Sequence, residues 1–150
     1  MKKYIQLATI SDTIGVSNCN KLCLPISYSP IEYGYYILSP YHEVIIIKYD
    51  NKIVGYLIGG YDNKIFHIMS IGVLKEYRNQ GLGKLLLDFA EKIVKPYVNT
   101  LSLYVHVENA SAINFYKNNG FKFNKRIKNY YRSAMKVKSS SDALHLMKQI

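Results

Sequence analysis

The chain has 150 residues, 49% of them hydrophobic, which is enough for one domain to bury a core without help from disulfides or a metal. No apolar run reaches the roughly 20 residues of a membrane-spanning helix, and no apolar stretch follows the first residues as it would in a secretory signal. We therefore expect one soluble domain over residues 1–150.

The net charge of +10, from 20 Lys and Arg against 10 Asp and Glu, favours anionic partners such as nucleotides, RNA or acidic surfaces. Part of this excess has a second explanation, because Asn, Lys, Ile and Tyr are all abundant, as a biased codon usage would produce. Cys19 and Cys23 are one turn apart on an expected helix, and no set of His, Cys or carboxylates has the spacing of a metal site. We expect free thiols, a reducing cytoplasmic compartment and no metal.

Strand and helix signals follow one another along the chain. Residues 3–9 alternate like a strand, and a helix is expected over 11–24, where Ser and Asp offer N-caps and Pro25 stops it. A Ser-Pro pair begins a second short helix over 29–39. The later apolar patterns predict strands at residues 43–49, 53–61, 64–73, 101–107, 121–125 and 143–147, and helices at 82–94 and 110–118.

The loop over residues 78–84, Arg-Asn-Gln-Gly-Leu-Gly-Lys, has the composition of a phosphate-binding site. Backbone N–H groups at a helix N-terminus lack partners within the helix and attract anions. We expect Gly81 and Gly83 to let phosphate oxygens reach these amides, and Arg78 and Lys84 to add positive charge. The string is neither a Walker loop nor a dinucleotide fingerprint, which would follow a parallel βαβ pattern. A pyrophosphate is the expected ligand.

Two motifs, standing in this order, resemble those of the GCN5-related N-acetyltransferase (GNAT) family. They are Arg78-x-x-Gly81-x-Gly83 after an antiparallel meander, and Asn109-x-Ser111-Ala112-x-x-Phe115-Tyr116-x-x-x-Gly120-Phe121. The resemblance implies an α/β fold with a mixed, mostly antiparallel sheet of about seven strands and about four helices, and acetyl-CoA as the cofactor. It also implies three groups of cofactor-binding residues. The pyrophosphate would be bound by Arg78, Asn79, Gln80, Gly81, Leu82, Gly83 and Lys84, and the pantetheine arm by the backbone of Ile71, Gly72 and Val73 on a bulged strand. Asn109 and Tyr116 would lie nearer the thioester.

Acetylation requires a neutral amine beside the thioester, and the pKa of the amine decides how much help it needs. An α-amine has a pKa of about 7.7 to 8.0, so roughly a tenth to a sixth of it is neutral at pH 7. A lysine side chain, with a pKa of about 10.4, is neutral in only about one molecule in 2,500. A protein N-terminus therefore demands little from a catalytic base.

Further segments resemble the N-terminal (Nα) acetyltransferases of the NatE type, which are close to the NatF type and modify proteins that begin with methionine. These segments are Leu24-Pro25-Ile26-Ser27-Tyr28, Ile68-Met69-Ser70-Ile71-Gly72, Tyr104-Val105-His106-Val107 and Lys128-Asn129-Tyr130-Tyr131. The resemblance implies transfer of an acetyl group from acetyl-CoA to an N-terminal α-amine. It also implies a peptide groove lined by Tyr28, Met69, Tyr130 and Tyr131, with Leu24, Pro25 and Ile26 as an apolar wall for the first methionine.

The resemblance implies that His106 takes the amine proton through an ordered water, a role that suits its near-neutral pKa. Where the family carries a catalytic tyrosine, this chain has His67, which shares a strand face with Met69. We expect pairing of the strands to bring His67 towards His106, so that both share the work of a base. The alternative is that His67 is a spectator and His106 suffices.

Two other functions remain open from the sequence. A GNAT enzyme acting on lysine or a small amine would need a stronger base, for which Glu108 is the candidate. A weakly active CoA-binding subunit of a ribosome-associated assembly, such as the NatA complex with which NatE-type subunits associate, would fit the positive charge. The expected partners are protein N-termini or nascent peptides, with no direct DNA binding and no membrane.

Overall fold

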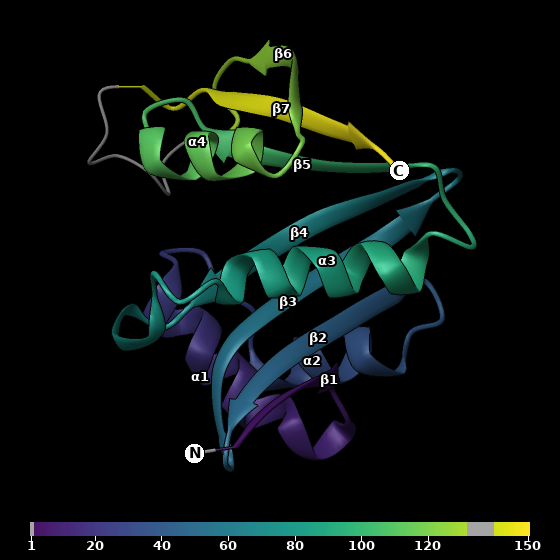
Figure 1. Cartoon of the computed structure of the whole chain (residues 1–150), viewed down its shortest axis with the longest axis vertical. Coiled ribbons are helices and arrows are strands. Elements are labelled where there is room, and N and C mark those ends of the chain that lie inside the picture. Colours follow the sequence, from purple (N-terminus) through teal and green to yellow (C-terminus); the bar gives the residue numbers. More distant parts are fainter. Residues whose placement is uncertain (1, 132–139) are drawn as a thin grey trace.

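The computed structural model describes residues 2–131 and 140–150, which form one mixed sheet with helices on both of its faces (Figure 1). The strand order is β1-β2-β3-β4-β5-β7-β6, and every neighbouring pair is antiparallel except β4 with β5. The strands are β1 (Lys3–Leu7), β2 (His42–Tyr49), β3 (Lys52–Asp62), β4 (Ile65–Val73), β5 (Thr100–His106), β6 (Lys122–Ile127) and β7 (Ala143–Gln149). The helices are α1 (Thr13–Cys23), α2 (Pro30–Leu38), α3 (Leu82–Val94) and α4 (Ala110–Asn118), with 3₁₀ turns η1 (Ile10–Asp12) and η2 (Lys75–Tyr77). The expected fold class is confirmed.

The two faces of β2 to β4 are covered by different helices, which explains why these strands are apolar on both sides. Figure 1 shows α3 on one face and α1 and α2 on the other. On α3, Leu82, Leu86 and Leu87 point into the core with Ala90 and Val94. The residues of β2 from Val44 to Ile47 are all buried. The core therefore lies on both sides of the first half of the sheet.

The start of α1 differs from the sequence expectation. Neither Ser11 nor Asp12 caps the helix through its side chain. The Asp12 carboxylate instead accepts the Thr9 backbone N–H at 2.8 Å and pairs with Lys48 Nζ at 2.8 Å, so it fastens η1 to β2. The start of α2 is as expected, because Ser29 accepts from the Glu32 N–H and Glu32 accepts from the Ser29 N–H.

The feature that positions the functional site is the divergence of β4 from β5. Parallel pairing covers only Ile65–Ile68 of β4 against Thr100–Leu103 of β5. At the next residue, Met69, β4 has a bulge, because Ser70 pairs with Ile58 of β3 and Ile68 with Gly59. From Met69 onward, β4 is paired with β3 alone, and its other edge faces an opening in the sheet.

Candidate functional site

The opening between β4 and β5 contains a cavity of about 450 Å³. Its walls come from the loop after α1, from both diverging strands, from α4 and from the segment after β6. All the residues expected to bind substrate line it, as do both histidines and three of the residues expected to bind cofactor. These residues are Leu24, Pro25, Ile26, Tyr28, Met69, Tyr130, Tyr131, His67, His106, Ile71, Asn109 and Tyr116.

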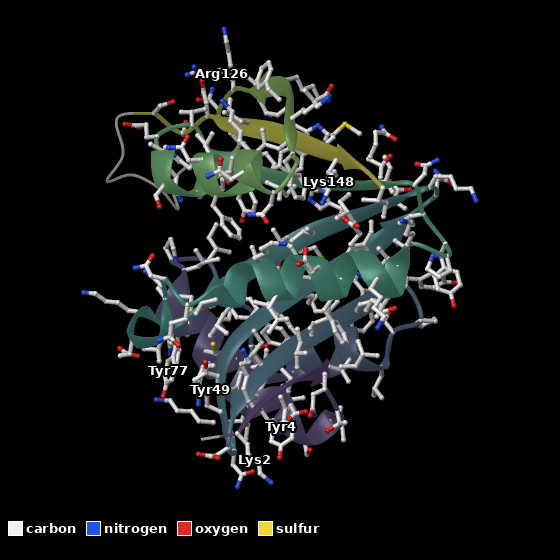
Figure 2. All side chains as sticks on the ribbon, in the orientation of Figure 1. Lys2, Tyr4, Tyr49, Tyr77, Arg126 and Lys148 are labelled. Atoms are coloured by element: carbon white, nitrogen blue, oxygen red, sulfur yellow. The ribbon has the colours of Figure 1, made fainter. Side chains whose placement is uncertain are left out.

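The loop before α3 presents a row of unpaired amides. Asn79 (φ 62°) and Gly81 (φ 79°) both adopt the left-handed conformation, which alternates with right-handed neighbours in anion-binding turns. Among the described residues, none of the backbone N–H groups from 79 to 84 has a hydrogen-bond acceptor. Tyr49 and Tyr77 lie edge to face beside this loop, with ring centroids 5.1 Å apart, and Tyr49 Oη donates to Gln80 Oε1 at 3.3 Å (Figure 2). The loop thus has the geometry of an anion site.

The charged residues of the loop and Gly83 also have contacts within the chain. Lys84 pairs with Asp88 at 2.8 Å one turn along α3, so its charge is already partly compensated. Arg78 Nε donates to the Val73 carbonyl at 2.9 Å and closes the loop against β4. A Cβ on Gly83 would lie 2.9 Å from the Phe115 ring, so this glycine also allows α3 to approach α4 closely.

Of the two histidines that line the cavity, His67 is the one whose ring has a nitrogen without a hydrogen-bond partner among the described residues. Its Nδ1 is 2.8 Å from Ser102 Oγ, and its ring contacts Tyr104 with centroids 5.1 Å apart. Its Nε2 has no hydrogen-bond partner among the described residues. Burial, with a smaller contribution from His145, lowers the pKa of His67 below its ordinary value, so the ring is neutral at physiological pH. A neutral imidazole with a free nitrogen can accept a proton.

His106 is buried, and both of its ring nitrogens have hydrogen-bond partners. Nδ1 accepts the Glu108 backbone N–H at 3.0 Å, which places the proton on Nε2, and Nε2 donates to the Ser140 carbonyl at 2.6 Å. The ring stacks on Tyr131. This geometry does not support the base role expected for His106, nor base work shared with His67, which lies opposite Ser102 in the strand register. His106, the last residue of β5, instead connects Glu108, just after β5, to Ser140, just before β7.

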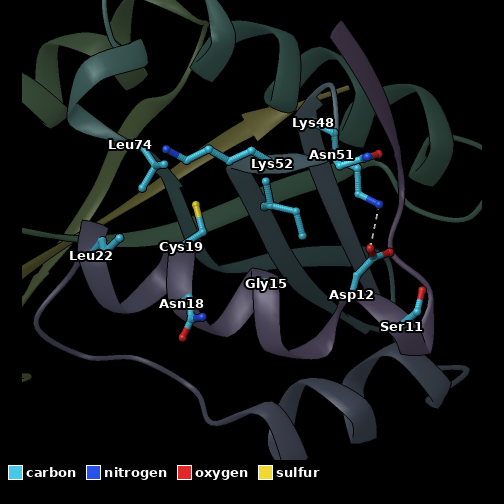
Figure 3. Close-up of a pocket in the computed structure, with 11 residues that line it drawn as sticks. Ser11, Asp12, Gly15, Asn18, Cys19, Leu22, Lys48, Asn51, Lys52 and Leu74 are labelled. Carbon is cyan, nitrogen blue, oxygen red and sulfur yellow. Dashed lines mark ion pairs between the residues drawn. The ribbon is translucent and has the colours of Figure 1, made fainter. Parts of the chain in front are cut away.

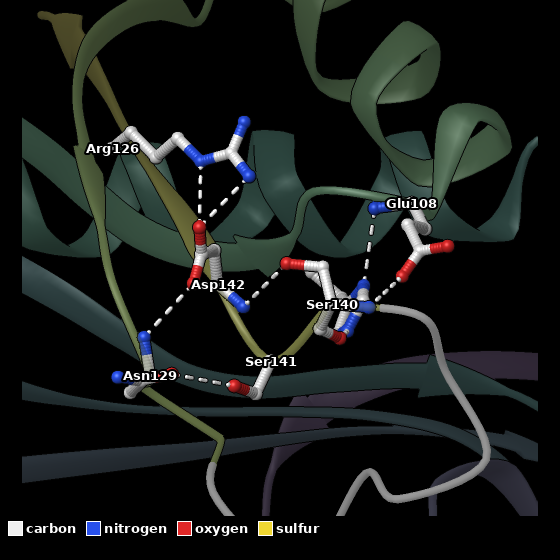
Figure 4. A network of polar contacts seen from close by, with 7 residues as sticks. Glu108, Arg126, Asn129, Ser140, Ser141 and Asp142 are labelled. Atoms are coloured by element: carbon white, nitrogen blue, oxygen red, sulfur yellow. Dashed lines mark hydrogen bonds and ion pairs between the residues drawn. The ribbon is translucent and has the colours of Figure 1, made fainter.

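Glu108, the candidate base for a lysine acetyltransferase, also has structural partners. Its Oε1 accepts the Ser140 backbone N–H at 2.6 Å (Figure 4). The same figure shows Asp142, which accepts from the Asn129 backbone N–H at 2.9 Å and from Arg126 Nε at 2.8 Å. These contacts hold the segment that carries Tyr130 and Tyr131 against the start of β7.

Tyr104 is a site residue that the sequence reasoning did not select. It lines the cavity, and its ring stacks on Tyr130 (centroids 4.5 Å apart) while also contacting His67 and His145. The signal was available, because Tyr104 lies two residues before His106 and therefore on the same strand face.

The apolar wall of the cavity is held by a buried polar network that the sequence reasoning also missed. Asn20 is fully buried, and its Oδ1 accepts from the Tyr28 backbone N–H at 3.1 Å and from Tyr33 Oη at 2.7 Å. Its Nδ2 donates to Tyr56 Oη at 2.9 Å, and Tyr56 Oη is 2.7 Å from Ser70 Oγ on β4. The network therefore connects the wall on one side of the cavity to the strand on the other.

Two residues of α4 complete the cavity. Asn109 is the N-cap of the helix, where its Oδ1 accepts the Ala112 N–H at 3.2 Å. Tyr116 is half-buried, and desolvation raises the pKa of its phenol well above the ordinary value, so the hydroxyl keeps its proton at neutral pH. Tyr116 can therefore donate a proton or a hydrogen bond into the cavity.

A second cavity of about 450 Å³ lies between α1 and the β2–β3 hairpin (Figure 3). It contains none of the predicted site residues, and the ion pair drawn there is the structural one between Asp12 and Lys48. Within residues 2–131 and 140–150, no group of three or more His, Cys, Asp or Glu side chains could hold a metal ion, and no helix is long and apolar enough to cross a membrane. The opening between β4 and β5 is therefore the site with convergent chemistry.

Comparisons with known proteins agree with this geometry. The sequence profile described as the Acetyltransferase (GNAT) family matches residues 15–121. An N-alpha-acetyltransferase of Sulfurisphaera tokodaii is 34% identical over 146 residues, which cover 87% of each chain. The N-terminal acetyltransferase A complex catalytic subunit NAA10 of Arabidopsis thaliana is 32% identical over 85% of this chain and 70% of its own. The structure of Arabidopsis thaliana Naa50 with the bisubstrate analogue CoA-Ac-MVNAL superposes with a TM-score of 0.84 at 23% identity and covers 100% of both chains.

Proposed function

The chain belongs to the GNAT acetyltransferase family, and from this premise we propose that it transfers the acetyl group of acetyl-CoA to the N-terminal α-amine of polypeptides. The observation that carries the proposal is the cavity between β4 and β5, which is lined by apolar residues, by several tyrosines and by a neutral histidine with a free nitrogen. The names of the relatives, N-alpha-acetyltransferase and NAA10, support the same substrate class.

The residues present fit acetyl-CoA. The unpaired amides from 79 to 84 suit its pyrophosphate, and the free edge of β4 from Met69 to Val73 offers N–H and C=O groups to an extended pantetheine arm. Acetyl-CoA supplies an electrophilic thioester when it is bound. The chain's own part is to hold the amine beside that group, to exclude water and to move protons.

His67 is the residue we assign as the base. Its Nε2 can accept the amine proton directly or through one water, while the Ser102 hydroxyl fixes the ring through Nδ1. The protonated phenol of Tyr116, which also lines the cavity, could then donate a proton to the thiolate that leaves as the acetyl group is transferred. A strong carboxylate base is not needed for an α-amine, and Glu108 is already held by Ser140. This favours an α-amine over a lysine side chain.

The apolar wall supports the narrower NatE-type assignment, in which the first residue is methionine. Leu24 and Ile26 line the cavity and yet are 38% and 47% exposed, so they offer uncovered apolar surface to a substrate side chain. An unbranched thioether fits such a surface. We further propose that the chain acts in the cytoplasm on nascent peptides as the catalytic subunit of a NatA-like, ribosome-associated assembly, a role suggested by the name of its Arabidopsis relative and by its net charge of +10.

An acetyl-CoA assay on short peptides tests the function. Peptides beginning Met-Leu, Met-Ala, Met-Lys and Ser, with internal lysines blocked, are compared with an N-terminally blocked peptide that has one free lysine. We expect turnover of the free α-amines, fastest for a first methionine, and none of the blocked peptide. Turnover of the lysine peptide alone would contradict the proposal.

The phosphate loop gives a separate prediction. Replacing Gly81 (φ 79°) with Ala puts a side chain in the left-handed conformation, which costs about 1 to 2 kcal/mol. The space around a Cβ there is open, so the cost is conformational and not a clash. We expect the KM for acetyl-CoA to rise about tenfold with kcat nearly unchanged. Lys92→Ala, at an exposed position of α3 outside the loop, is the control, and an unchanged KM in Gly81→Ala would remove the loop from the cofactor site.

A further inference from the structure

One face of the second half of the sheet is not covered by helices. On β7, Lys148 pairs with Glu91 of α3 at 2.8 Å, so Lys148 and alternate residues before it face the helices. His145 and Met147 point to the opposite face and are half-exposed. Figure 1 shows α1 and α2 lying over β1 to β4 and not over β5, β7 and β6. Among the described residues, no helix therefore covers this face of the three strands, which we call the open face, and its exposed part lies on β7 and β6.

The open face continues directly from the cavity. Tyr104 of β5 lines the cavity and lies opposite His145 of β7, with ring centroids 4.9 Å apart. Tyr130, 44% exposed, stacks on Tyr104 from above the sheet. Next in the same row, Lys125 of β6 lies opposite His145. A polypeptide that leaves the cavity past Tyr104 would thus cross β7 and reach β6.

This face has an excess of free positive charge. The three strands contain no Asp or Glu and four cations. Arg126 and Lys148 are paired, with Asp142 and Glu91 respectively, and point to the helix side of the sheet. Lys122 and Lys125 lie on the open face, both are exposed, and neither has an ion-pair partner among the residues that the structure describes. The two lysines without an ion pair therefore lie on the same face of the sheet as Tyr104, which lines the cavity.

We propose that Lys122 and Lys125 select polypeptides with acidic side chains a few residues after the acetylated terminus. This inference rests on the proposed function and names the substrate class within it. Neighbouring strands are about 4.8 Å apart, so β6 is about 10 Å from β5, a distance that about three residues of extended chain span. With the first two residues inside the cavity, the side chains at about positions 4 to 6 lie over the two lysines.

The test uses peptides that begin Met-Leu and carry two Glu, two Ser or two Lys residues at positions 4 to 6, with every lysine side chain trimethylated so that it keeps its charge but cannot be acetylated. Exposed charge pairs are weak and screened, so we expect kcat/KM for the Glu peptide to exceed that for the Lys peptide about three- to tenfold in low salt, and the ratio to approach one in 0.5 M NaCl. In Lys122→Glu/Lys125→Glu the ratio should fall to one or invert. The control, Lys2→Glu/Lys3→Glu, makes the same charge change at the far end of the sheet.

Three results would overturn the inference: equal turnover of all peptides by the wild type, an unchanged ratio in the Lys122→Glu/Lys125→Glu protein, or an equal fall in the control. Competitive inhibition by a 20-nucleotide poly(U) together with equal turnover of all peptides would assign the face to nucleic acid instead. Failure to acetylate any peptide would contradict the proposed function, and the inference would then be decided by fluorescence anisotropy of the same labelled peptides. Equal dissociation constants for the Glu and Lys peptides would overturn it.

Discussion

Replacing His67 with phenylalanine is expected to lower kcat/KM for a Met-initiated peptide about 100-fold, because the ring that remains has no nitrogen to accept the amine proton. The pH dependence of kcat/KM is a more specific test of the role of His67 than the loss of activity. The α-amine titrates near pH 7.7 to 8.0, so kcat/KM falls about tenfold per unit below that range in any variant. Burial places the pKa of His67 below about 6.5, so the wild-type profile should steepen further only when pH falls through that lower value, as the ring gains a proton.

The second break in the profile should disappear in His67→Phe. His145→Phe is the matched control, since His145 also has a pKa lowered by burial and contacts Tyr104 but does not line the cavity. That variant should keep the break and most of the activity. A break that persists in His67→Phe and is lost in His106→Gln would show that the nitrogens of His106 are released during catalysis and that His106 is the base.

Replacing Asn20 with leucine is expected to lower the free energy of unfolding by about 3 kcal/mol, because the Tyr33 hydroxyl and the Tyr28 N–H lose their partner, Tyr56 Oη keeps only Ser70, and the side-chain volume is nearly unchanged. For a chain of this size the midpoint of thermal unfolding should fall by about 10 °C. Since the network also holds the apolar wall, the KM for peptide should rise more than the KM for acetyl-CoA.

The chain offers a close control for this change. Asn18 is on the same helix but exposed, so Asn18→Leu should change the free energy of unfolding by no more than about 0.5 kcal/mol. Thermal unfolding of both variants, followed by circular dichroism, measures the difference. Similar midpoints for the two proteins would mean that water replaces the lost partners and that the network does not hold the wall.

The local elements could be predicted where one short-range pattern decides them. The apolar patterns predicted helices over residues 82–94 and 110–118, which are the observed bounds of α3 and α4. The strand predicted from Phe121 begins one residue later, because the Phe121 N–H bonds back to the Tyr116 carbonyl and Gly120 (φ 93°) ends the helix. Turn geometry of this kind competes with the strand pattern and is not visible in hydrophobic spacing.

The sequence predicted residues that share one cavity, but it did not predict their contacts. The residues that line the cavity follow from motifs, whereas the state of His106 depends on Ser140, which is 34 positions away. The same is true of Asn20 and Tyr56, which are 36 positions apart. Which nitrogen is free and which amide is paired are decided by long-range packing, and no local spacing encodes them. For this reason the sequence did not show that His67 has a free ring nitrogen whereas His106 has none.

The short pairing between β4 and β5 has a consequence for how the molecule opens. Four residue pairs connect β5, β6 and β7 to the rest of the sheet, while the pairing of β7 with β5 and β6 is longer. A unit joined in this way can detach without global unfolding, so its amides should exchange with solvent faster than those of β2 and β3. A ligand that binds to the facing edges of β4 and β5 opposes this detachment. It should slow amide exchange in proportion to the ratio of its concentration to its dissociation constant. Acetyl-CoA would in this sense act as the strand that completes the sheet.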